Sequence, residues 1–131
     1  MLQFTVPGEP FSKQRARVTS RGTYTPKVTK TAEAVVAGAF RREHRAWRPT
    51  EKGTEAWSVR VVVYRYERHG RDVDNLTKTV LDALNGHAWE DDCDVEVLNF
   101  TTIWVNTRAE ARTEVTLTPT GSLPRPPRLR R

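Results

Sequence analysis

The sequence has little cysteine and no long apolar run, and each absence excludes a class of protein. The only cysteine among the 131 residues is Cys93, so one chain cannot close a disulfide framework. A reducing, cytoplasmic setting is the simplest expectation. No run approaches the roughly 18 to 20 apolar residues of a membrane helix, and the first residues lack the features of a signal peptide. These absences predict a globular protein without a membrane segment.

Several metal and nucleotide motifs are also missing. The three histidines, His44, His69 and His87, have no HExxH or CxxC context, which argues against a zinc site. A calcium loop would need acidic or amide ligands where Leu76 and Thr77 stand. The sequence contains no glycine-rich phosphate loop and no GxSxG motif. Any metal site must therefore be built from carboxylates.

Charge is abundant and unevenly distributed. The net charge is +6, and residues 119–131 contain four arginines and no acid. Six basic residues between positions 8 and 30 face one acid, Glu9; they are Lys13, Arg15, Arg17, Arg21, Lys27 and Lys30. Residues 90–96, by contrast, hold five acids and no base. This pattern predicts a polyanionic partner such as DNA, held by basic segments around a central cation.

Hydrophobic periodicity predicts one α+β domain over residues 1–118. Alternating residues predict strands over 2–8, 56–68, 94–106 and 112–119, and the last two are expected to form a hairpin through NTRAEA. Helical spacing predicts helices over 28–47 and 75–85, the second capped by Asp74 and ended by Gly86. The order β-α-β-α-β-β indicates one mixed sheet, with a loop over 8–26 and a disordered basic tail over 119–131.

Two acidic groups flank the second predicted helix. Asp72 and Asp74 precede it, and Asp91 and Asp92 follow its turn. If the chain doubles back along the helix, three or four carboxylates converge, which favours a hard cation such as Mg²⁺ or Mn²⁺. The structural alternative is that Asp74 only caps the helix and Asp72 is a solvated loop acid. Lys78 also has a structural and a functional interpretation. It forms a surface ion pair with Asp82, or its ammonium group lies near the scissile phosphate.

The segment DVDNLTKTVLDALNGHAWEDDCDV resembles the signature of the RusA-type Holliday junction resolvases, a family common in phages and prophages. VPGEPFSKQRAR and YTPKVTKTAE are similar to the basic entry region of phage-borne members. The resemblance covers roughly residues 2 to 118. One departure is NFTTIWVN, which has threonines where some members carry a lysine.

This resemblance implies a metal-dependent endonuclease that acts on branched DNA as a homodimer. The metal ligands would be Asp72, Asp74 and Asp92, and the essential lysine would be Lys78. Magnesium or manganese would support in-line attack of water on a phosphodiester. The expected contacts to flanking phosphates come from Lys13, Arg15, Arg17, Lys27 and Lys78. A less selective branch or flap nuclease and a non-catalytic DNA-binding protein remain as alternatives.

Overall fold

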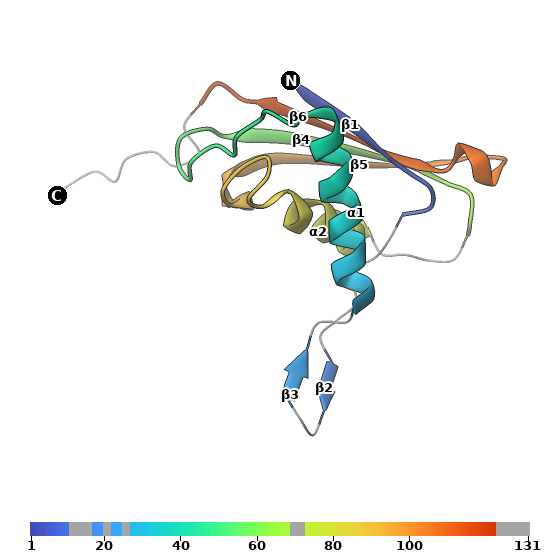
Figure 1. Cartoon of the computed structure of the whole chain (residues 1–131). Helices are drawn as coiled ribbons and strands as arrows, with labels where there is room; N and C mark the ends of the chain where they lie inside the picture. Colours follow the sequence, from blue (N-terminus) through green and yellow to red (C-terminus); the bar gives the residue numbers. More distant parts are fainter. Residues whose placement is uncertain (11–16, 20–21, 25–26, 69–72, 123–131) are drawn as a thin grey trace.

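The computed structural model describes residues 1–10, 17–19, 22–24, 27–68 and 73–122, and it forms a sheet with two helices on one face (Figure 1). The strands of this sheet are β1 (Leu2–Pro7), β4 (Trp57–Arg65), β5 (Val95–Trp104) and β6 (Arg112–Pro119). The helices are α1 (Lys27–Glu43) and α2 (Val73–Leu84), with short 3₁₀ turns at Asp92–Asp94 and Arg108–Glu110. The predicted α+β class and β-α-β-α-β-β order are confirmed.

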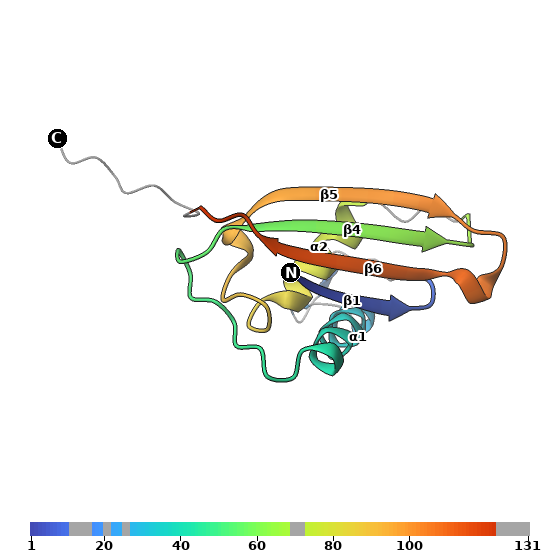
Figure 2. The ribbon, with the colours of Figure 1, turned by 90° about the horizontal axis from the view of Figure 1, so that it is seen from above.

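The strand order is β1-β6-β4-β5, and only β4 and β5 run parallel. Figure 2 shows both arrows pointing the same way, with β5 at the outer edge. Because α2 connects these two parallel strands, β4, α2 and β5 form a βαβ unit. The helix therefore begins near the end of β4 and finishes near the start of β5. This topology controls where the acidic groups lie.

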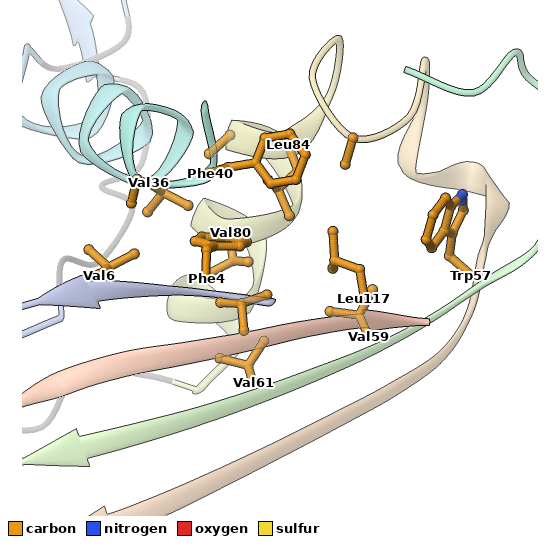
Figure 3. Packing of buried hydrophobic residues seen from close by; sticks show 14 of the residues in the cluster. Phe4, Val6, Val36, Phe40, Trp57, Val59, Val61, Val80, Leu84 and Leu117 are labelled. Carbon is orange, nitrogen blue, oxygen red and sulfur yellow. The ribbon is translucent and has the colours of Figure 1, made fainter. Parts of the chain in front are cut away.

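The core lies between the sheet and the two helices. Alternate residues of β4 are buried, and four of them belong to the hydrophobic core: Trp57, Val59, Val61 and Val63. Figure 3 shows Phe40 from α1 and Val80 and Leu84 from α2 pointing toward these strand residues. Burying each such side chain contributes about 1.5–3 kcal/mol. The period-two pattern of this segment therefore predicted its buried face correctly.

Three sequence-based boundaries were wrong. Residues 17–19 and 22–24, predicted to be loop, form the short antiparallel strands β2 (Arg17–Thr19) and β3 (Gly22–Tyr24). Helix α1 ends at Glu43, because Trp47 turns back so that its backbone N–H bonds the His44 carbonyl. Helix α2 begins at Val73, so Asp74 lies inside the first turn and is not the N-cap. Gly86 has a positive φ of 79° and follows the helix as predicted.

The predicted β5–β6 hairpin was also wrong. Strand β6 lies between β1 and β4, and it is antiparallel to both. Its residues Thr113, Val115 and Leu117 are buried. The NTRAEA segment therefore carries the chain across the end of β4.

Two further predictions concern membrane-spanning helices and the C-terminal tail. None of the described helices is long and apolar enough to cross a membrane. At the start of the predicted tail, Thr120 N–H donates to the Ala56 carbonyl, and Ala56 N–H donates to the Ser122 carbonyl. Residues 123–131 lie outside the described part, so the disordered tail stays a prediction.

Candidate active site

Most acids of the segment WEDDCDVE hold the fold together. Asp94 is fully buried, and its Oδ2 accepts a 3.0 Å hydrogen bond from Gly53 N–H. Glu90 Oε2 accepts a 3.2 Å bond from Lys52 N–H. Both acids therefore fasten the turn before β4 to the segment before β5. These carboxylates accept hydrogen bonds that stabilise the fold.

Asp91 also has a structural role. Its Oδ1 accepts a 3.0 Å bond from Cys93 N–H and caps the 3₁₀ turn, and its Oδ2 lies 3.8 Å from Lys52 Nζ. The backbone bond to Cys93, followed by the charge of Lys52, lowers the pKa of Asp91. The ionised form is thus favoured in the fold.

Asp92 lies in a different environment, beside the last turns of α2. Burial raises the pKa of its carboxyl group, and the charges of Asp91 and Asp82 raise it further, while a hydrogen bond from Asn85 opposes these effects. Trp89 Nε1 donates a 2.9 Å bond to Asn85 Oδ1, which turns the amide nitrogen of Asn85 toward Asp92. Asp92 is therefore a positioned carboxylate among like charges, an arrangement that favours a cation.

Asp74 and Lys78 lie at and near the other end of α2. Both side chains are exposed, and Lys78 follows Asp74 by one turn. Asp82, which neighbours Asp92, is about 12 Å farther along the helix axis than Asp74. No group of three His, Cys, Asp or Glu side chains suited to a metal occurs within the described ranges. The sequence predicted that WEDD returns to the start of the helix, but Asp92 lies near the other end of α2, away from Asp74. Asp72 lies outside the described residues.

The βαβ topology explains this separation. Asp74 follows the end of β4, whereas Asp92 precedes β5, whose first residues pair with the start of β4. A helix of 12 residues, about 18 Å long, spans the distance between these two ends. One chain therefore places the two acids at opposite ends of the sheet.

The first residues of the basic segment 8–26 lie at the end of the sheet where β4 finishes. Glu9 Oε1 accepts hydrogen bonds from Tyr66 N–H (2.9 Å) and Glu67 N–H (3.1 Å), and Pro10 is buried. These bonds fasten Glu9 to the residues that directly follow β4. The expected DNA contacts remain predictions: Lys13 and Arg15 lie outside the described residues, and Arg17 and Lys27 begin β2 and α1.

An aromatic and arginine group at this end was not predicted from the sequence. The guanidinium carbons of Arg65 and Arg68 lie 5.2 and 5.3 Å from the centre of the Trp104 indole ring. The arginines near DVD were visible in the sequence, but Trp104 joins them only because it pairs with Arg65 in the parallel register. Asn85 and Asp82 were likewise not identified as neighbours of Asp92.

The sequence matches the model of one known protein family. The model for Endodeoxyribonuclease RusA matches residues 7–118, which is most of the chain. The protein therefore belongs to the RusA endodeoxyribonuclease family, a class of DNA-cutting hydrolases. Membership implies Holliday junction endonuclease activity, with branched DNA as the substrate. No curated protein matches the sequence.

Proposed function

We propose that the protein is a magnesium-dependent, homodimeric endonuclease that resolves Holliday junctions by paired phosphodiester hydrolysis. The observation that supports this proposal is the division of roles within WEDDCDVE. Three acids accept hydrogen bonds that stabilise the fold: Glu90, Asp91 and Asp94. Asp92 instead lies near other acids and is hydrogen-bonded by Asn85. A fold without a catalytic role for Asp92 would gain little from this arrangement, because the like charges destabilise it.

The available donors fit magnesium or manganese. Asp72, Asp74 and Asp92 offer only carboxylate oxygens, which hard divalent cations prefer. When bound, the cation would activate water and neutralise charge on the phosphate. Lys78 is exposed one turn after Asp74, so its ammonium group can approach a phosphate bound near that end of α2. Its role is to offset charge that develops on the phosphoryl oxygens.

A second chain meets two requirements of this reaction. Asp74 and Asp92 lie at opposite ends of α2, so one chain does not assemble the complete ligand set. Resolution also needs two cuts in strands that are related by approximate two-fold symmetry. A C₂ dimer presents two equivalent sites with that symmetry.

The basic segments position DNA without reading its sequence. Glu9 bonds the backbone of Tyr66 and Glu67, so the residue that precedes the proposed basic contacts is held beside the chain that follows β4. Lys13, Arg15, Arg17 and Lys27 are the proposed contacts. Such binding weakens as salt rises, because each phosphate contact releases counterions.

Cleavage of synthetic DNA tests the proposal. A labelled four-way junction, a flap and a linear duplex are incubated with saturating protein in Mg²⁺, Mn²⁺ or EDTA. We expect symmetrically paired nicks in the junction with either metal and none in EDTA. Equal cleavage of all three substrates would favour a less selective nuclease, and cleavage that persists in EDTA would contradict the metal requirement.

A further inference from the structure

Trp104 presents an exposed indole ring at the end of β5. Its side chain is 47% exposed, whereas Trp57 and Trp89 are fully buried and Trp47 packs against the core. An apolar ring that stays half in water forgoes much of the stabilisation that its burial would give. Exposed aromatic rings are the surfaces on which nucleic-acid-binding proteins stack unpaired bases.

Two arginines hold their guanidinium groups against this indole. Their central carbons lie 5.2 Å (Arg65) and 5.3 Å (Arg68) from the ring centre. Arg65 is buried, and its carbonyl accepts a 2.9 Å hydrogen bond from Val105 N–H, so the ends of β4 and β5 are fixed to each other. Arg68 is exposed, and the acid beside it, Glu67, is already paired with an arginine farther along the chain. We call Arg65, Arg68 and Trp104 the indole platform.

The indole platform lies on the face of the sheet that carries the helices, at the end where α2 begins. Trp104 pairs with Arg65 in the parallel register, so both side chains lie on the same face as Val63, which is part of the core. Val63 and Leu76, a residue of the first turns of α2, line one small cavity.

The covalent chain keeps the indole platform close to the candidate ligands at the start of α2. Asp74 follows Arg68 by six residues, so their backbones are at most about 20 Å apart. At roughly 3.4 Å for each nucleotide step, this limit corresponds to about six nucleotides. A base on the platform therefore belongs to the DNA that immediately flanks a phosphate bound near Asp74.

We propose that the indole platform stacks one unpaired base beside the branch point of the DNA, and that this contact makes the enzyme prefer branched to linear DNA. The inference deepens the proposed function and rests on it. Every base has a π-face, so the contact requires no particular sequence. It does require a base outside the double helix, and the energy of extruding a base is least where the base is already unpaired. Arg68 adds a positive charge for the adjoining phosphate.

Equilibrium binding in EDTA tests the platform without cleavage. Trp104→Ala should weaken binding of a four-way junction about 5- to 150-fold, the effect of losing one base–aromatic stack, and should barely change binding of a linear duplex. Ile103→Ala is the matched control, because Ile103 is a 40% exposed apolar residue of the same strand on the opposite face of the sheet. The control should leave both affinities unchanged. Equal losses for junction and duplex, or equal effects of the two variants, would overturn the proposal.

A double-mutant cycle identifies the base. Abasic sites are placed one at a time around the branch point, and each junction is titrated with the wild type and with Trp104→Ala. At one position the abasic site should weaken wild-type binding as much as the substitution does, and it should weaken binding by Trp104→Ala no further, because both changes remove the same contact. Losses that add at every position would refute the stacking contact.

Two measurements exclude an indirect effect of the substitution. Light scattering and melting curves should give Trp104→Ala the same subunit state and nearly the same Tm as the wild type. A change of subunit state would assign the indole to a contact between chains and overturn the proposal. In the unmodified protein, a junction in EDTA should protect the exposed indole from quenching by acrylamide, and an equal length of duplex should not. Equal protection by both DNAs would count against the platform.

Cleavage in Mg²⁺ separates this inference from the proposed function. If the wild type shows the coupled position and the protected indole but cuts no junction, the proposed function fails and the platform stands. If the wild type makes paired nicks in the junction and no abasic position is coupled to Trp104, the platform is wrong and the proposed function stands.

Discussion

Replacing Asp92 by asparagine should abolish cleavage without destabilising the protein. Burial and the charges of Asp91 and Asp82 raise the pKa of this carboxyl above its ordinary value of 3.8. A raised pKa means that Asp92 stabilises the fold below the ordinary value, and that this stability is lost as pH rises through the folded-state pKa. At pH 7 the ionised carboxylate therefore opposes folding.

The stability change should be small and favourable. Each like-charge pair at the surface costs about 0.2–0.5 kcal/mol, and solvent screens both pairs, so the gain should stay below about 1 kcal/mol. For a domain of this size that gain corresponds to a rise in Tm of less than about 4 °C. The loss of cleavage should exceed about 100-fold, since even indirect supports of a metal site cost about 10- to 100-fold.

The assay compares melting curves and junction cleavage at saturating protein, each with and without Mg²⁺. The wild type should melt at a higher temperature when Mg²⁺ is added, because a ligand of the folded state stabilises it. Asp92→Asn should lack this response. Asp91→Asn is the matched control: it loses the ion pair with Lys52, so its Tm should fall slightly while cleavage persists. Near-normal cleavage by Asp92→Asn would refute the assignment, as would a Tm loss combined with an unchanged Mg²⁺ response.

Asn85, Lys78 and His87 each give a further test. Asn85→Ala should lower cleavage by about 10- to 100-fold and raise the Mg²⁺ concentration required, because Asp92 loses its positioning amide; an unchanged Mg²⁺ dependence would leave Asn85 a purely structural residue. Lys78→Ala should reduce single-turnover cleavage by about 100- to 1000-fold, while an exposed side chain of this kind contributes at most about 0.5 kcal/mol to stability; a lower Tm with an unchanged rate would favour a surface ion pair. Burial and then the charge of Arg41 lower the pKa of His87 below 6.5, so Tm should fall as pH drops below 6.5 toward the folded-state pKa. His87→Gln should reduce this dependence of Tm on pH. An equal slope of Tm against pH for the variant and the wild type would contradict the prediction.

The sequence by itself determined the local structure and the chemistry available. Alternation over residues 57–65 requires one buried face, whichever strands lie beside it, because successive strand side chains point to opposite faces. The chain can turn at Gly86 after α2 because glycine adopts a positive φ without steric cost. The segments DVDNLTK and WEDD likewise identified the family, since their residue types and spacing are properties of the chain alone.

Tertiary structure decided which strands are neighbours and which acids act together. The alternation of β5 and β6 is similar, yet β6 is interior and β5 is an edge, because periodicity records faces and carries no information about order in the sheet. The parallel β4–β5 pairing then sets Asp74 and Asp92 at opposite ends of α2, although they are close in sequence. Likewise, only packing distinguishes Asp91, which caps a turn, from Asp92, which Asn85 holds beside Asp82, because each carboxylate takes its role from groups brought to it by the fold.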